Sequence, residues 1–285
     1  MPTDPHAEVV GYYRRWESRA SYRLLLGGTR HFGYYPSGAG HVPARAALAF
    51  MEERLGRALD LPPGARVLDA GCGRGHVAMR LAAEFGYRVH GVDLLAGDVA
   101  RARAEAARRG LGALVGFEVG DYADLPVPDA HFDGAFTLET LVHAPDAAAA
   151  LAEFARVLAP GGRLALFEYS VAPPEALTVQ ERALLRRISA GSAMHSMPGF
   201  VHGRLAELVA AAGFEGIKEA DLTERMLPML RWLGRVLWAP YQVTRLLRAE
   251  AKVVNSLAAV QVVRHPGLWR YNALTAVRAG SPGPP

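Results

Sequence analysis

The stretch VLDAGCGRG, from Val67 to Gly75, decides the fold of this 285-residue chain. Its apolar start predicts a buried strand, and the following HVAMRLAAEF predicts a helix that begins at His76. Glycines occupy alternate positions between them, at Gly71, Gly73 and Gly75. Glycine is needed where the backbone turns sharply and approaches a ligand closely, because a Cβ would clash there. The helix N-terminus adds free N–H groups suited to a carboxylate or phosphate. The stretch therefore predicts a ligand site at the end of a strand.

The spacing of these glycines separates classes of nucleotide site. A dinucleotide fingerprint needs a glycine or alanine three positions after the second glycine, and His76 stands there instead. A P-loop needs a lysine after the glycines, and none follows. Asp69, two positions before the first glycine, can orient the loop and meet an ammonium group. This arrangement favours a site for S-adenosylmethionine.

Acidic residues also follow the next two predicted strands. Asp93 comes about twenty residues after the glycines, where a carboxylate can accept both ribose hydroxyls. Asp121 follows the third strand, where an acid commonly meets the adenine amino group. Three acids at three successive strand ends indicate a nucleoside-bearing cofactor. We expect its contacts to come from Asp69, Gly71, Gly73, Gly75, Asp93, Leu94, Asp121, Tyr122 and Leu138.

The sequence around this motif alternates short apolar runs with helical stretches, which is typical of an α/β, doubly wound sheet. Five strands are predicted at Arg66–Ala70, Arg88–Val92, Val115–Val119, Gly134–Leu138 and Arg163–Glu168. The helices between them are predicted near His76–Phe85, Asp98–Arg109 and Asp146–Leu158. Two further strands are predicted at Gly216–Ala220 and Asn272–Arg278.

Two segments lie outside this alternating pattern. Residues 1–60 predict helices interrupted by the glycine-rich stretch Gly27–Gly40, and we expect them to form an N-terminal lid. Residues 61–285 are predicted to form the core, with an insertion at about 222–269 between the last two strands. An insertion of that size indicates a helical cap or a subunit contact. Its arginines, Arg231, Arg235, Arg245 and Arg248, alternate with Trp232 and Trp238 and leave a third alternative open, peripheral contact with a membrane.

Composition excludes several classes of protein. The net charge is +4, but 30 of the 32 basic residues are arginines, so the basic balance reflects residue choice and gives no reason to expect nucleic acid. The single cysteine, Cys72, excludes an internal disulfide and a cysteine-rich metal site, and we expect no bound metal. No apolar run reaches the ~18 residues of a membrane span, and the N-terminus does not resemble a signal peptide. We therefore expect a cytoplasmic protein, and a homo-oligomer.

Polar residues gather after the fourth and fifth predicted strands. Glu139 and His143 lie four apart in FTLETLVHAPD, and Glu168 and Tyr169 end the next strand. In an open α/β sheet the carboxyl ends of the strands form the ligand crevice. We interpret these four residues as catalytic groups facing one pocket. The alternative is that Glu139 caps the turn and His143 packs beneath it.

Four motifs resemble those of class I S-adenosylmethionine-dependent methyltransferases, and the resemblance covers about residues 60–170. They are VLDAGCGRG, GVD, GDYADLPVPDAHFD and RVLAPGGRLALFEY. The resemblance implies a seven-stranded, Rossmann-like sheet whose last strand is antiparallel. Amino-methylating enzymes of nucleic acids carry an Asn/Asp-Pro-Pro-Tyr sequence where this chain has Leu138-Glu139-Thr140, so that class is excluded.

Three shorter stretches resemble a narrower group, the sterol and isoprenoid C-methyltransferases. They are Glu139–Pro145 with Val142 at the usual cysteine position, Phe167-Glu168-Tyr169, and the aromatic HFGYY from His31 to Tyr35. The resemblance implies that Tyr13, Phe32, Tyr34 and Tyr35 contact a hydrophobic acceptor, such as a sterol, a terpenoid or a prenylated natural product.

The hypothesis that follows is methyl transfer to an alkene carbon. The reaction leaves a cation that aromatic faces stabilise, and a carboxylate or imidazole then removes a proton or the cation rearranges. Glu139 and His143 are the candidates for that base. An O- or N-methyltransferase of a secondary metabolite, with His143 as the base, is the alternative. A non-catalytic nucleotide-binding protein is a third reading.

Overall fold

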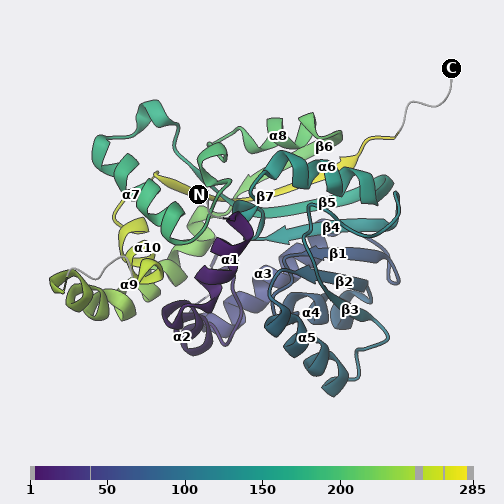
Figure 1. Ribbon diagram of the computed structural model, residues 1–285, viewed down its shortest axis with the longest axis horizontal. Helices are drawn as coiled ribbons and strands as arrows, with labels where there is room; N and C mark the ends of the chain where they lie inside the picture. The colour runs from purple at the N-terminus through teal and green to yellow at the C-terminus, as the bar shows by residue number, and fades with distance from the viewer. Residues whose placement is uncertain (1–3, 39, 248–252, 266, 281–285) are drawn as a thin grey trace.

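A computed structural model describes residues 4–38, 40–247, 253–265 and 267–280 of the chain. Its centre is a seven-stranded sheet of order β3-β2-β1-β4-β5-β7-β6 (Figure 1). The strands are β1 (Arg66–Ala70), β2 (Arg88–Asp93), β3 (Val115–Val119), β4 (Phe132–Leu138), β5 (Leu158–Val171), β6 (Phe214–Asp221) and β7 (Trp269–Arg278). Strands β1 to β5 pair in parallel, whereas β7 is antiparallel to both β5 and β6. The predicted Rossmann-like sheet with an antiparallel last strand is confirmed.

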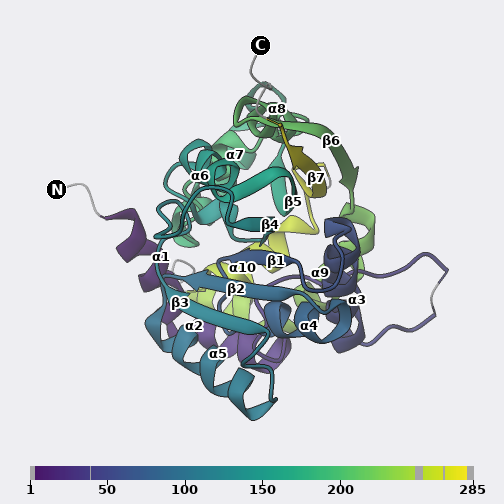
Figure 2. The same cartoon turned by 90° about the vertical axis from the view of Figure 1, so that its right-hand side faces the viewer.

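Helices cover both faces of this sheet. Helices α3 (Ala44–Leu59) and α4 (His76–Phe85) pack together on one face (Figure 2). Helices α6 (Ala147–Val157) and α8 (Leu205–Ala211) pack together on the other. Helix α5 (Ala96–Arg108) lies against β2 and β3 at the sheet edge. The central strands are therefore buried on both sides, which explains why they appear in the sequence as continuous apolar runs.

The remaining helices gather at one end of the sheet (Figure 1). They are α1 (Pro5–Arg14), α2 (Trp16–Leu25), α7 (Val179–Gly191), α9 (Thr223–Leu246) and α10 (Val254–Val262). Single turns of 3-10 helix occur at Leu141–His143, Pro174–Ala176 and Met197–Gly199. The predicted insertion at 222–269 thus contains two helices, and it also includes residues 248–252 and 266, which lie outside the described residues.

Hydrogen bonds fix the N-terminal helices against the insertion. Tyr12 donates from its hydroxyl to Asn255 Oδ1 at 2.6 Å, and the buried Glu17 accepts from the backbone N–H of Ser256 at 3.2 Å. These contacts join α1 and α2 to α10 across more than two hundred residues of sequence. In the described residues no helix combines the length and the apolar character that crossing a bilayer requires.

Candidate active site

The glycine loop adopts a backbone that other residues rarely adopt. Gly71 and Gly75 have φ of +91° and +71°. A Cβ on Gly71 would lie 2.6 Å from the Thr140 side chain, and one on Gly75 would lie 2.4 Å from the ring of Phe117. The loop is therefore packed so tightly against β3 and the end of β4 that only glycine fits. This packing holds the N-terminus of α4 at the mouth of a cavity.

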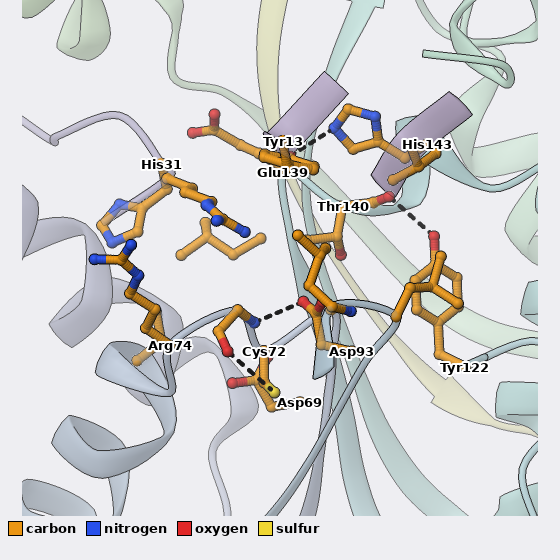
Figure 3. Close-up of a pocket in the computed structure, with 18 of the residues that line it drawn as sticks. Tyr13, His31, Asp69, Cys72, Arg74, Asp93, Tyr122, Glu139, Thr140 and His143 are labelled. Carbon is orange, nitrogen blue, oxygen red and sulfur yellow. Dashed lines mark hydrogen bonds between the residues drawn. The ribbon is translucent and has the colours of Figure 1, made fainter. Parts of the chain in front are cut away.

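Asp69 is buried at the end of β1 and faces that cavity (Figure 3). Its Oδ2 atom has no hydrogen-bond partner among the described residues. Burial, and then the nearby Asp93, raise the pKa of Asp69 to about 8. A buried carboxyl with an unused oxygen fits a ligand that brings its own positive charge, because such a partner offsets the cost of ionising the group.

Asp93 ends β2 and accepts backbone N–H groups on both of its oxygens, from Gly73 and from Leu95, each at 2.8 Å. These bonds hold the carboxylate against the glycine loop (Figure 3). Tyr122 donates to the Thr140 carbonyl at 3.0 Å. One cavity is lined by eight of the nine cofactor residues expected from the sequence: Asp69, Gly71, Gly73, Asp93, Leu94, Asp121, Tyr122 and Leu138. We name it the cofactor cavity. The ninth residue, Gly75, packs against Phe117 behind the loop and has a structural role.

A second, more apolar cavity lies beside the first, and we name it the acceptor cavity. Helices α2, α7, α9 and α10 form most of its wall. Its apolar lining includes Leu25, Leu26, Phe32, Ile188, Met194, Met226, Leu230, Leu233, Leu237, Ala258 and Val262. Three side chains line both cavities: Arg30, His31 and Glu139.

Glu139 is buried at the junction of the two cavities. Tyr169 donates from its hydroxyl to Oε2, and Oε1 accepts from the Phe32 backbone N–H at 2.6 Å and from the Tyr271 hydroxyl at 3.0 Å. Burial raises the pKa of Glu139 to about 7, against the lowering effect of these donors. Its backbone has φ of +60°, and strained backbone of this kind clusters at functional sites.

His143 lies in the cofactor cavity and is neutral. Its Nδ1 lies 3.0 Å from the Ala193 carbonyl, which can only accept, so Nδ1 carries the hydrogen. Its Nε2 therefore accepts from the Tyr13 hydroxyl at 2.9 Å (Figure 3). Burial lowers the pKa of His143 to about 4. Tyr13 thus occupies the one ring nitrogen that could serve as a base.

Glu168 does not face either cavity, unlike the other predicted catalytic residues. It is fully buried, and one of its oxygens accepts the backbone N–H groups of Thr140 and Leu141 at 3.1 and 2.9 Å. Successive residues of a strand point to opposite faces, so Tyr169 faces the acceptor cavity and Glu168 cannot. Glu168 holds the turn after β4 in place.

The predicted acceptor contacts divide in the same way. Phe32 lines the acceptor cavity, edge-on to Tyr169 with ring centroids 6.2 Å apart. Tyr34 lies in a separate groove beneath Arg54, and Tyr35 packs with α3 and α9. Tyr13 lines the cofactor cavity instead. The placement of Tyr34 and Tyr35 away from the acceptor cavity is a correction to the expected set. Their backbone N–H groups donate to the Ala47 and Arg225 carbonyls at 2.8 and 2.9 Å, so the chain leaves the cavity after Phe32 and runs between α3 and α9.

Two cationic side chains at the junction were not anticipated from the sequence. Arg30 pairs with the buried Asp98 of α5, and its guanidinium lies 4.3 Å from the ring centroid of Tyr13. His31 contacts the Phe32 carbonyl through Nδ1 at 3.0 Å and Glu52 through Nε2 at 3.1 Å. The Phe32 carbonyl can only accept, and an ionised Glu52 accepts as well, so this geometry fits a protonated His31. Burial acts to lower the pKa of His31, but Glu52 raises it overall. These residues lie in an irregular segment, where no periodicity marks a buried position.

Among the residues that the structure describes, no group of three His, Cys, Asp or Glu side chains is arranged to hold a metal ion. The buried Cys72 packs beneath Gly91, and burial raises the pKa of its thiol well above the ordinary value. The thiol is therefore uncharged, and its role in the loop is packing.

Comparison with known proteins agrees with this geometry. Residues 68–166 match the family model described as a methyltransferase domain. The chain is 40% identical over 277 residues to an S-adenosyl-L-methionine-dependent Diels-Alderase, iccD, of Talaromyces variabilis, covering 94% of this chain and 93% of that protein. It is 33% identical to 24-methylenesterol C-methyltransferase 2 of Oryza sativa subsp. japonica, over 79% of this chain and 62% of that protein. The crystal structure of the [4+2]-cyclase SpnF superposes with a TM-score of 0.77 at 25% identity and covers 99% of both chains.

The chain therefore belongs to the S-adenosylmethionine-dependent methyltransferases. Its cofactor is S-adenosylmethionine, and the unpartnered Asp69 carboxyl, the glycine loop and the Asp93 carboxylate fit that molecule. The family includes enzymes that methylate carbon, oxygen or nitrogen and, as the names of two relatives say, enzymes that catalyse cyclisation.

Proposed function

We propose that this enzyme transfers a methyl group to a carbon of a hydrophobic, isoprenoid-type acceptor such as a sterol, a terpenoid or a prenylated natural product. The observation that carries the proposal is the position of Glu139, a buried carboxyl with three hydrogen-bond donors at the junction of the cofactor and acceptor cavities. A proton acceptor at that point lies where a cation would form on the acceptor.

The residues of the cofactor cavity divide the task of binding. Asp69 meets the ammonium group, Asp93 the ribose hydroxyls and Asp121 the adenine amino group. When bound, S-adenosylmethionine supplies an electrophilic methyl group. The described part of residues 1–60 would act as a lid, because Arg30 lines both cavities while paired with Asp98, and Tyr12 anchors α1 to α10.

The acceptor cavity holds an alkene against its apolar wall. The electron pair of the double bond would form the new bond to the methyl carbon while the bond from that carbon to sulfur breaks and its electron pair stays on the departing S-adenosylhomocysteine. The second alkene carbon would be left positive. The rings of Phe32 and Tyr169 stabilise that charge by cation–π attraction. Glu139 then takes the proton from the neighbouring carbon, which restores a double bond; its pKa of about 7 suits this role near neutral pH.

The test is mass spectrometry of products formed from methyl-labelled S-adenosylmethionine and a panel of sterols, prenyl diphosphates, prenylated indoles and phenols. A labelled methyl on carbon supports the proposal. A labelled methyl on oxygen or nitrogen would transfer the assignment to the alternative, O- or N-methylation. His143 would then have to release Tyr13 before it could act as a base.

A second candidate function is a [4+2] cyclisation without methyl transfer. Two observations favour it: the two relatives described as a Diels-Alderase and a [4+2]-cyclase match nearly the whole chain, and two cationic side chains stand at the junction. Positive charge there opposes a carbocation, whereas it polarises a carbonyl on a polyene and so accelerates cycloaddition. Glu139 and Tyr169 would then orient the polyene.

One comparison separates the two functions. Methyl transfer releases one S-adenosylhomocysteine for each product, whereas cyclisation leaves the mass of the acceptor and the amount of S-adenosylmethionine unchanged. A linear polyene that isomerises without release of S-adenosylhomocysteine, and does so only with the cofactor present, would establish the cyclase and overturn methyl transfer as the reaction.

A further inference from the structure

The outer face of α9 carries arginines and a tryptophan along one side. Arg231, Arg235 and Arg245 are exposed, and so is Trp238, at 50% of its surface. At 3.6 residues per turn these four positions fall on one stripe along the helix. Arg264, which follows α10, adds a further positive charge beside this stripe, because it lines the same groove as Arg231, Arg235 and Trp238.

An apolar stripe adjoins the basic one. Val236 and Val243 are seven residues apart and about half exposed, at 44% and 55%. Leu246 and Leu247 extend the stripe with 83% and 72% of their surfaces exposed. We define the α9 outer face as Arg231, Arg235, Val236, Trp238, Val243, Arg245, Leu246 and Leu247. Arg248, which the sequence placed in the same series, lies outside the described residues.

The charged side chains of the α9 outer face are all positive. After Glu224, α9 contains no acidic residue, and α10 contains none. Within the described part of the chain no acidic side chain pairs with Arg231, Arg235 or Arg245. Basic residues beside exposed tryptophan and aliphatic side chains are the composition of a helix that rests in the interface of an anionic bilayer.

The opposite face of the same helix forms the acceptor cavity. Met226, Leu230, Leu233 and Leu237 line that cavity from α9. One helix therefore separates an apolar cavity from a basic and apolar outer surface. We propose that the α9 outer face docks on an anionic lipid surface, from which a hydrophobic acceptor enters the cavity. The proposed docking does not depend on the proposed reaction. Only the delivery of an acceptor rests on that reaction.

A second copy of the chain fits this face less well. In a two-fold symmetric dimer through α9, the arginines of one copy would lie against those of the other, and neither face offers a carboxylate. An anionic lipid surface supplies the missing negative charge. The lipid surface is therefore the occupant that the charge favours.

The test measures binding of the full chain to vesicles, with neither acceptor nor turnover required. Sedimentation with vesicles of phosphatidylcholine and phosphatidylglycerol in a ratio of 3:1 is expected to carry the protein down, whereas pure phosphatidylcholine vesicles leave most of it in solution. Raising the salt from about 0.1 to 0.5 M should release it, because screening shortens the reach of surface charge.

Matched variants locate the contact. Arg231→Gln with Arg235→Gln should weaken binding about 30-fold, since each basic residue near an anionic surface contributes about fivefold. Arg88→Gln with Arg204→Gln removes the same charge from exposed positions elsewhere and should weaken it by less than about threefold. Trp238→Ser tests the apolar component, and thermal unfolding of each variant checks its fold.

Three outcomes would overturn the proposal. Equal binding by the two double variants, or no binding to the 3:1 vesicles, would show that α9 is no docking face. Self-association that Arg231→Gln with Arg235→Gln abolishes, without vesicle binding by the parent protein, would assign the face to a subunit contact instead. None of these results bears on methyl transfer, which the labelled-product experiment decides separately.

Discussion

Tyr271 of β7 donates a hydrogen bond from its hydroxyl to Oε1 of Glu139 at 3.0 Å, across 132 residues of sequence. Tyr271 is fully buried and lines neither cavity, so any effect of its side chain on a reaction in these cavities would pass through Glu139. The antiparallel pairing of β7 with β5 aligns Tyr271 with Tyr169, which donates to the other oxygen. The last strand of the sheet thus fixes the ionisation of a group at the junction of two cavities.

The first prediction concerns this positioning role. Tyr271→Phe removes a donor that stabilises the ionised carboxylate, so the pKa of Glu139 should rise above its value of about 7. A hydrogen bond to a charged group contributes about 1.5–3 kcal/mol, which corresponds to a rise of roughly one to two pKa units. If Glu139 is the base, turnover rises with pH as its carboxyl ionises. The rising limb of the pH–rate profile should therefore move to higher pH by that amount. The pH profile of the rate checks it, and an unmoved limb would remove Tyr271 from this role.

Glu139→Gln should lower turnover by about 100-fold or more, because an amide cannot accept the proton. Cofactor affinity, measured by calorimetry, should stay the same, since Glu139 accepts no group of the glycine loop. Glu168→Gln provides the control, because its amide oxygen can still accept from Thr140 and Leu141 and the residue faces no cavity. Turnover of Glu139→Gln at the parent rate would exclude Glu139 as the base.

Cofactor binding should release a proton below pH 8. The pKa of Asp69 is raised to about 8 in the free protein, so the carboxyl is mostly protonated at pH 7 and must ionise to meet a cation. Affinity should therefore increase by up to about tenfold per pH unit below pH 8 and level off above it. Calorimetry in buffers of different ionisation enthalpy measures how many protons are released when the cofactor binds. Asp69→Asn should bind more weakly and show no such dependence; a pH-independent parent protein would contradict the assignment.

Gly75→Ala should destabilise the fold by more than the strain of a left-handed backbone, because the added Cβ would also clash with neighbouring side chains. Gly64 has a similar left-handed φ of +86° but nothing within 4 Å of an added Cβ, so Gly64→Ala carries only the strain of about 1–2 kcal/mol. At Gly75 the added Cβ also meets the Phe117 ring at 2.4 Å and Ala102 at 3.1 Å. Urea unfolding of both variants measures the difference, and equal losses would mean that the ring moves aside freely.

Much of the fold could be predicted because the core is encoded locally. The strands β1 and β3 and the helix α4 have the predicted bounds, since apolar runs bounded by glycine or charge leave the chain few alternatives. The strand β5 is longer than predicted, beginning at Leu158, because Ala159 to Gly162 join it in an irregular pairing that no apolar pattern marks. Helix α9 continues through Pro228 and Pro240, and its buried face packs against the rest of the cap.

The sequence by itself determined the sheet, the glycine loop and the acids at the strand ends, because each of these depends on neighbouring residues and on the fixed geometry of parallel strands. Only the tertiary structure decided which side chains meet across long separations. It joined Glu139 to Tyr271 and Phe32, turned Glu168 away from both cavities, occupied His143 with Tyr13 and placed the cations Arg30 and His31 at the junction. The physical reason is that burial, hydrogen bonding and ionisation at this site depend on segments brought together by packing, and no local pattern records which segments those are.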